Sequence, residues 1–227
     1  VQLKGKFITA IRNLPLEPYI DIAETHTDRE KSKIFLDFFS KLPKSDSCYL
    51  CFKQDSTLLK SAITVGYQVQ IAKTLIINPD GSKSNLYKES VLRNLQFAIK
   101  TSRAVLPVEN IQEVYSLMCE MMHKRNVKIP FSKQYFTDWW RKNDEDIIAL
   151  RTVDSKGNTC ALMVNLEKHD RIIYLIGALN RDYSQRGDME LIINKTIQIS
   201  REKTKIFDFN GSRNYQIRRF FRGFMPD

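Results

Sequence analysis

The spacing of apolar residues along this chain predicts a mixed α/β fold. Over residues 28–41 apolar side chains recur three and four positions apart, which is the pattern of one helix face, and 108–125 repeats it. After residue 146 the pattern changes to short runs of β-branched and aromatic residues separated by polar turns, which is typical of strands. We therefore expect helices in the middle of the chain and an antiparallel meander in its last third.

Turn residues set the expected ends of these elements, because Pro43 follows the first helix and Asn78-Pro79-Asp80-Gly81 ends a strand. The length of 227 residues fits one large domain or two small ones, and we expect an N-terminal part at 1–83 and a C-terminal part at 84–227. The expected helices are 28–41, 84–103, 108–125 and 131–141, one after Gly187 and one at the C-terminus. The expected strands are 7–12, 19–23, 48–52, 65–77, 146–153, 159–167, 171–178 and 205–209.

Two features of the helical region have more than one interpretation. The helix at 108–125 carries a methionine-rich apolar stripe, which we expect to be core rather than a cofactor surface. Trp139 and Trp140 are neighbours and cannot both point inward, so one of them is either half-buried or lines a groove. The residues of the stripe are Ile111, Val114, Tyr115, Met118, Met121 and Met122.

Charge narrows the range of partners. The chain has 36 Lys and Arg against 26 Asp and Glu, and the net charge of +10 favours an anionic partner such as a nucleotide, a coenzyme, an RNA or a lipid surface. A basic protein that is merely soluble is the alternative. The 42% hydrophobic content is typical of a globular protein, and no apolar run approaches the roughly 20 residues needed to span a bilayer.

The four cysteines indicate neither a disulfide framework nor a metal site. Cys48 and Cys51 lie in an apolar run that is typical of a strand, where residues three apart face opposite sides. Cys119 and Cys160 are isolated and the three histidines are scattered, so we expect no metal. A reducing, cytoplasmic setting is the simpler inference.

The segment 207–224 turns from a strand directly into an arginine-rich helix. Gly211 and Ser212 supply a sharp turn and an N-cap hydroxyl. Such a corner binds a phosphate or a polarised carbonyl, or it is simply how an α/β chain turns. Arginine interleaved with phenylalanine likewise suits RNA contacts or a packed terminal helix. These residues are Arg213, Arg218, Arg219, Arg222, Phe220, Phe221 and Phe224.

The order of elements after the middle helices, three strands, a loop, a helix, a strand and a helix, resembles the GNAT acyltransferase fold. Three segments are similar to motifs of its FemAB-type branch, the aminoacyl-tRNA-dependent peptidyltransferases. They are SVLRNLQFAIK at 90–100, an aromatic residue followed by two apolar residues, Gly and Ala at 174–178, and an Asp-Phe-x-Gly-Ser corner at 208–212. The resemblance implies a mixed, largely antiparallel sheet flanked by helices, in a duplicated GNAT unit whose N-terminal copy is degenerate or truncated.

The resemblance also implies a site. The strands at 171–178 and 205–209 are expected to part and to form a cleft in which an amine acceptor meets an acyl carbonyl. Asp208 holds or deprotonates the acceptor, unless it caps its own corner, and Tyr174 donates to the leaving group or lines the slot, unless it is a core aromatic. The residues expected to bind the oxyanion or the acceptor are Asn210, Gly211 and Ser212.

The implied acyl carrier is an aminoacyl-tRNA or a CoA thioester. GNAT enzymes that use acetyl-CoA have a glycine-rich loop before the carrier-binding helix, whereas this chain has one glycine followed by Asp188. A carboxylate there repels a pyrophosphate, which disfavours CoA more than an aminoacyl-tRNA. The residues expected at the carrier's phosphates are Arg93, Lys100, Arg186 and Gly187, although a solvated face explains Arg93 and Lys100 equally well.

Two functions are consistent with these patterns. The first is an N-acyltransferase or aminoacyltransferase that moves an acyl group from its carrier to an amine. The alternative is a non-catalytic module of the same fold that binds RNA or another polyanion through its basic surface. The strand order and the intact corner favour the first function, and the missing glycines favour the second.

Overall fold

The computed structural model describes residues 27–41, 56–66, 74–80, 87–124, 126–127, 129, 131–210 and 214–224. The chain forms two compact units, residues 1–72 and 73–227, and each is described by itself. The boundary expected at residue 83 therefore lies within the second of these units. The strands expected at 7–12, 19–23 and 48–52, and with them Cys48 and Cys51, lie outside the described residues.

The described part of the first unit consists of two helices, α1 (Asp28–Lys41) and α2 (Ser56–Thr64), which pack on each other. The bounds of α1 are those predicted. It begins in a capping box, because the amide of Thr27 donates to the Glu30 carboxylate at 2.8 Å and the amide of Glu30 donates to the Thr27 hydroxyl at 3.4 Å. That residues 1–83 form part of a GNAT-like half stays a prediction.

A six-stranded sheet in the order β1-β6-β5-β4-β3-β2 organises the second unit. Every pair of neighbouring strands is antiparallel except β5 and β6, which are parallel. The predicted mixed, largely antiparallel sheet is therefore confirmed. The strands are β1 (Ile76–Ile77), β2 (Ala104–Pro107), β3 (Ile147–Val153), β4 (Thr159–Lys168), β5 (Arg171–Leu179) and β6 (Ile206–Asp208).

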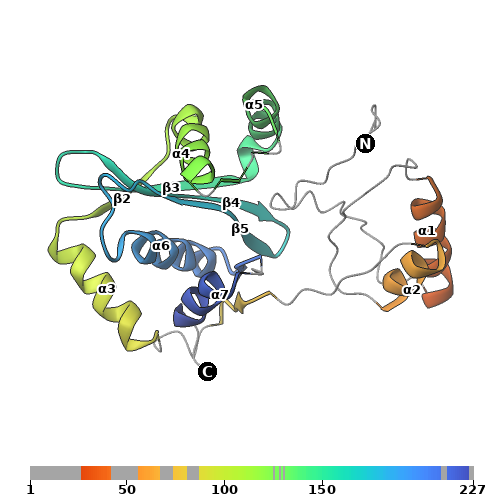
Figure 1. Ribbon diagram of the computed structural model, residues 1–227. Coiled ribbons are helices and arrows are strands. Elements are labelled where there is room, and N and C mark those ends of the chain that lie inside the picture. Colours follow the sequence, from red (N-terminus) through yellow and green to blue (C-terminus); the bar gives the residue numbers. More distant parts are fainter. Residues whose placement is uncertain are drawn as a thin grey trace. The chain divides into compact units, whose positions relative to one another are not determined.

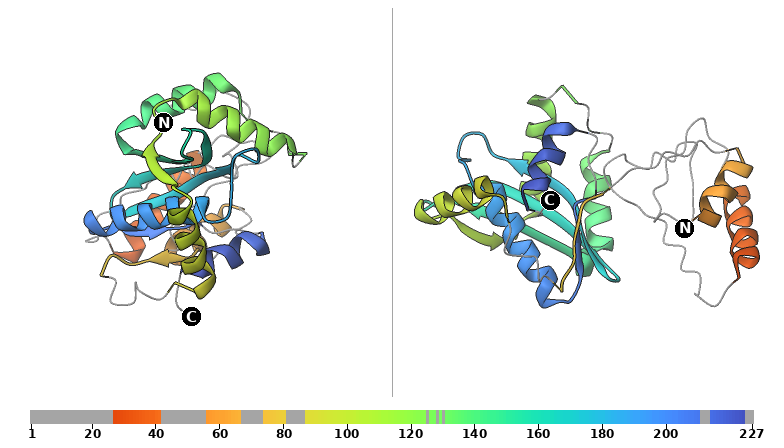
Figure 2. Two further views of the ribbon diagram at one scale, coloured as in Figure 1. Left: turned by 90° about the vertical axis from the view of Figure 1, so that its left-hand side faces the viewer. Right: turned by 90° about the horizontal axis from the view of Figure 1, so that it is seen from below.

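Helices cover both faces of this sheet, with α4 and α5 on one face and α3, α6 and α7 on the other (Figures 1 and 2). One-turn 3₁₀ helices, η1 and η2, follow α5 and α7. The bounds are α3 (Glu89–Lys100), α4 (Ile111–Lys124), α5 (Lys133–Lys142), η1 (Asp144–Asp146), α6 (Asp188–Glu202), α7 (Tyr215–Phe221) and η2 (Arg222–Phe224).

Two predictions about the edge strands were wrong. β2 was missed because its four residues lie between two helices and end in Pro107, a residue that is tolerated in an edge strand. The strand expected at 65–77 does not begin at Val65, because Val65 and Gly66 form a turn after α2, and within the described part of this range the strand is Ile76–Ile77. The following α4 starts late because the amide of Val108 still pairs with β3.

The cores on the two faces are apolar, as the sequence pattern requires. Three isoleucines of α6, Ile192, Ile193 and Ile197, are fully buried on one face of the sheet. In α4, Val114 and Met118 are buried, which confirms the interpretation of the methionine-rich stripe as core. Trp139 is only 7% exposed, whereas Trp140 is half-buried and lines a depression, so only one of the two points inward.

Candidate functional site

β5 and β6 part after three paired residues, and we call this place the seam. Their parallel ladder joins Arg171 to Ile206, Ile172 to Phe207 and Ile173 to Asp208. β5 then continues to Leu179 along β4, while β6 ends. The two strands therefore part after Ile173 and Asp208, as predicted, whereas the cleft expected between them stays a prediction.

A bulge in β5 lies next to the last paired residue of the seam. Asn165 of β4 is opposite Tyr174 and Val164 is opposite Ile176, so Leu175 is an extra residue in β5. Bulges bend a strand, increase its twist and re-aim its side chains. The bulge therefore gives a local physical reason for β5 to turn away from β6 at this point.

Aromatic rings occupy the space beside the seam. The ring of Tyr174 meets Phe221 of α7 edge to face at 5.3 Å between centroids, and Phe221 lies 4.5 Å from Phe209. The Tyr174 side chain lies over Gly177, since a Cβ added to that glycine would lie 1.9 Å from the Tyr174 hydroxyl oxygen. The glycine of the 174–178 motif thus makes room for the tyrosine.

Asp208 lies on the other face of the sheet. Phe207 and Phe209 belong to the apolar cluster against which Tyr174 packs, so strand alternation directs Asp208 away from that cluster. Its carboxylate accepts from Arg171 at 2.8 Å, from the amide of Asn210 at 2.8 Å and from Thr74. The structure therefore does not bring Asp208 and Tyr174 together, and the contact with Asn210 matches the capping alternative.

The corner after β6 differs from the prediction at its helix start. Asn214, and not Ser212, is the N-cap of α7, because its side chain accepts from the amides of Gln216 and Ile217 at 2.8 and 3.3 Å. Asn210 is exposed and has a positive φ of 57°. Gly211 and Ser212 lie outside the described residues, so their expected roles stay predictions.

The start of α6 is closed by internal contacts. Gly187 has a φ of 95°, and a Cβ there would lie 2.2 Å from the backbone oxygen of Asn94, so this glycine allows α3 and α6 to approach each other. Asp188 is fully buried, with its carboxylate 3.1 Å from Arg103 and accepting from the amide of Gln185 at 2.5 Å. A protein carboxylate thus lies at the positive end of the helix, where a carrier's phosphate would bind.

The environment of Asp188 is apolar enough to change its acidity. Burial raises the pKa of Asp188, and the nearby Arg103 guanidinium and the Gln185 amide oppose that rise. Two residues on, Glu190 is also buried and accepts from Asn94 at 2.6 Å. The sequence analysis did not predict these partners of Asp188 and Glu190. The signal for them was the presence of two acids in the first turn of an otherwise apolar helix, which indicates that polar groups pack against the start of α6.

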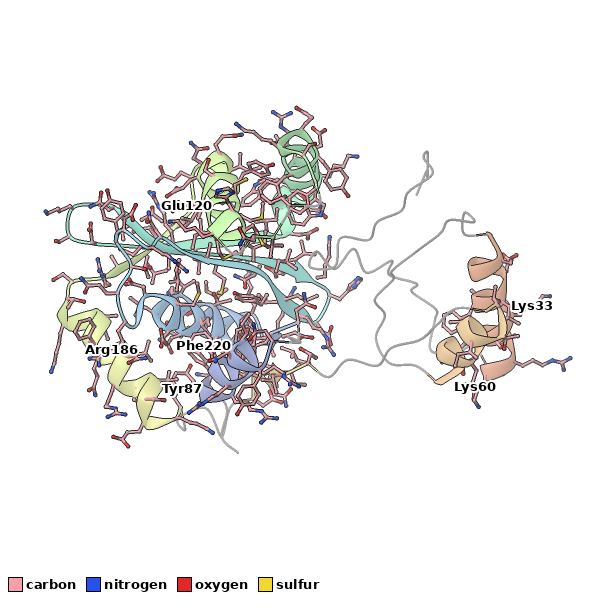
Figure 3. The ribbon with its side chains drawn as sticks, viewed as in Figure 1. Lys33, Lys60, Tyr87, Glu120, Arg186 and Phe220 are labelled. Atoms are coloured by element: carbon pink, nitrogen blue, oxygen red, sulfur yellow. The ribbon has the colours of Figure 1, made fainter. Side chains whose placement is uncertain are left out.

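The other residues expected at a carrier's phosphates lie on or beside α3. Arg93 is exposed and lies 3.8 Å from Glu89, one turn away on the same helix. Lys100 is exposed at the end of α3. Arg186 stacks over the ring of Phe97 at 4.5 Å and thus extends beside α3 (Figure 3). The loop before α6 therefore places Arg186 beside α3. Arg93, Lys100 and Arg186 do not form a dense basic cluster.

α7 separates its aromatic residues from its arginines. Phe221, and Phe224 just after the helix, are buried, which confirms their interpretation as core. Three arginines of this segment are exposed, and within the described parts of the chain none of them pairs with a carboxylate. They are Arg218, Arg219 and Arg222.

The described residues contain neither a metal site nor a membrane-spanning helix. No group of three or more His, Cys, Asp and Glu side chains is placed there to hold a metal ion. Among the same residues, no helix is both long and apolar enough to cross a membrane.

The chain resembles several solved structures. No family model and no curated protein matches it. FemX superimposes with a TM-score of 0.59 at 12% identity, over 74% of this chain and 65% of FemX. The C-terminal domain (DUF2156) of a putative lysylphosphatidylglycerol synthetase from Agrobacterium fabrum gives 0.57 at 12%, over 76% and 62%. L-PGS from Bacillus licheniformis gives 0.50 at 11%, over 66% and 48%.

These likenesses define the fold of the chain. It has the GNAT-type fold of FemX and of the DUF2156 domain, as the order of its elements predicted. The chain spans less than two thirds of the length of each of these three structures.

Proposed function

We propose that this chain is an acyltransferase that moves an aminoacyl group from a carrier to an amine acceptor at the seam. The observation that carries the proposal is the parting of β5 and β6 after Ile173 in a chain of FemAB-like fold. Acyl transfer requires a place where a carrier's carbonyl can reach an amine, and two parallel strands that separate provide one.

The chemistry needs few groups from the protein. The amine nitrogen attacks the carbonyl carbon, a C–N bond forms, and the bond from that carbon to the carrier's oxygen or sulfur breaks. Tyr174 donates a proton to the leaving atom and takes up the proton that the attacking amine loses, so its hydroxyl is restored, and the backbone amide at the Leu175 bulge stabilises the oxyanion. Asp208 acts as a positioning residue, since its bond to Arg171 holds the closed end of the seam.

The carrier that the geometry favours is an aminoacyl-tRNA. The carboxylates of Asp188 and Glu190 at the start of α6 oppose a pyrophosphate, which disfavours CoA. The exposed arginines of α7 offer phosphate contacts that an RNA can use. One structural neighbour is named as a putative lysylphosphatidylglycerol synthetase, which supports an aminoacyl group as the cargo.

A labelled-donor assay tests this proposal. The full chain is incubated with tRNA charged with radioactive amino acids, or with radioactive acetyl-CoA, together with a panel of amine acceptors. We expect label to move from tRNA to an amine, with little or no transfer from acetyl-CoA. Transfer from acetyl-CoA alone would overturn the choice of carrier, and no transfer from either donor would overturn the proposed function.

A second candidate is a non-catalytic module that binds RNA. The observation that favours it is the set of exposed arginines of α7. It predicts binding to RNA that weakens steeply with salt and that falls when Arg218, Arg219 and Arg222 are replaced by glutamine. Binding without any transfer would favour this candidate over the transferase.

A further inference from the structure

A depression of about 310 Å³ lies toward the β2 edge of the sheet, two to three strands from β5. It is formed where β2 ends, α4 begins, and η1 leads into β3. Its walls include Trp140, Ile147 and Ile111. Its β3 residues Ile147 and Ala149 lie two strand spacings from β5, roughly 10 Å, and its β2 residue Pro107 lies three spacings from β5, roughly 14 Å. It is therefore a separate place from the proposed reaction site.

The charges that line this depression are unusual for the protein. The chain has a net charge of +10, yet the charged residues of the lining are Glu109 and Asp144, and no basic residue lines it. Within the described residues, neither carboxylate forms an ion pair. The negative charge that lines this depression therefore attracts a cation. It repels the nucleotides and phosphates that the rest of the basic surface would attract.

Trp140 is held in a fixed position in this wall. Its indole nitrogen donates to the Asp144 carboxylate at 3.1 Å, and the backbone of Asp144 in turn accepts from the amide of Ile147. One carboxylate oxygen of Asp144 thus orients the tryptophan, while the other accepts no hydrogen bond from another described side chain. An aromatic wall beside a carboxylate is the combination that binds organic cations, because the ring attracts positive charge and covers an alkyl chain.

We propose that this depression binds a primary ammonium group at the end of an alkyl chain, as in a lysine side chain. Ligand pockets measure roughly 300–1,000 Å³, so a site at the lower end of this range suits a side chain better than a nucleotide. The alkyl chain lies against Trp140 and the isoleucines, and the ammonium group lies between Glu109 and Asp144. This site does not depend on the proposed transferase activity.

Two-dimensional NMR of the full chain labelled with ¹⁵N tests the proposal. The chain has two tryptophans, so it gives two indole N–H signals, and Trp140→Phe identifies which one belongs to Trp140. The signal of the buried Trp139 is the internal control. The probes are N-acetyl-lysine methylamide and its uncharged isostere N-acetyl-norleucine methylamide, with a short lysine peptide titrated in parallel.

We expect the lysine probe to shift the Trp140 signal and the norleucine probe to bind at least about fivefold more weakly. Asp144→Asn, which can still accept from the Trp140 indole, should weaken lysine binding about three- to fivefold, as should Glu109→Gln. Glu145→Gln is the matched control, because Glu145 is exposed beside Asp144 but does not line the depression. Tighter binding of the peptide would identify a lysine-bearing peptide as the source of the ammonium group.

Three results would overturn the proposal. The first is equal binding of the lysine and norleucine probes. The second is an effect of Glu145→Gln as large as that of Asp144→Asn. The third is a Trp140 signal that does not move with the lysine probe or the peptide at concentrations up to about 50 mM.

Discussion

Replacing Gly177 with alanine will destabilise the second unit through the side chain of Tyr174. A Cβ at this position would lie 1.9 Å from the Tyr174 hydroxyl oxygen and 2.9 Å from the ring carbon that bears it. Gly177 has no left-handed φ, so the backbone itself accepts alanine. The tyrosine must therefore move away from its place beside Phe221.

The size of this effect follows from three contributions. Forced repacking costs about 1–3 kcal/mol, and losing the edge-to-face contact with Phe221 costs about 0.5–1.5 kcal/mol. Replacing glycine recovers about 0.4–1 kcal/mol of chain entropy in the unfolded state. The net loss is about 2 kcal/mol, which in a unit of this size lowers the Tm by about 4–8 °C.

A double-mutant cycle measured by urea and thermal unfolding tests this reasoning. In the Tyr174→Ala background there is no hydroxyl to meet the new methyl group, so Gly177→Ala should cost less than about 0.5 kcal/mol there. An equal cost of Gly177→Ala in both backgrounds would refute the account, because the glycine would then be needed for a reason unrelated to Tyr174.

Two further substitutions test the ion pairs of the sheet. Asp208→Asn removes the charge that Arg171 contacts at 2.8 Å and should lower the free energy of unfolding by about 2 kcal/mol in urea titrations, and a loss below about 0.5 kcal/mol would contradict this. Burial acts to raise the pKa of Glu167, but hydrogen bonds from Lys203 and Lys205 outweigh it and lower the pKa. This lowered pKa means that the stability from Glu167 is present above its ordinary pKa and lost as the pH falls through the folded value. The difference in unfolding free energy between the wild type and Glu167→Gln should therefore shrink in acid below about pH 4.5, and a difference that stays constant there would contradict this.

The sequence predicted those parts of the fold whose causes are local. The capping pair at Thr27 and Glu30 sets the start of α1, and polar turns at 154–158 and 169–170 separate β3, β4 and β5. At the second turn His169 takes a positive φ of 47°. The separation of β5 from β6 was expected from the resemblance to the GNAT fold and not from local sequence patterns.

The contacts that define the candidate site could not be predicted, because they join residues far apart in the sequence. Asp208 alternates with phenylalanines in a pattern that fixes its face of the sheet, but nothing local indicates Arg171 as its partner. The pairing of Asp188 with Arg103 could not be predicted for the same reason. Only the crossing of α3 and α6 at Gly187 brings them together.

The most direct test of the central claim is the rate of aminoacyl transfer by Tyr174→Phe under single-turnover conditions. Phenylalanine keeps the ring contact with Phe221 and removes only the hydroxyl. The account predicts a rate constant lower by about 100-fold with unchanged tRNA affinity. A variant that transfers as fast as the wild type would contradict the assignment of the reaction to the seam beside Tyr174.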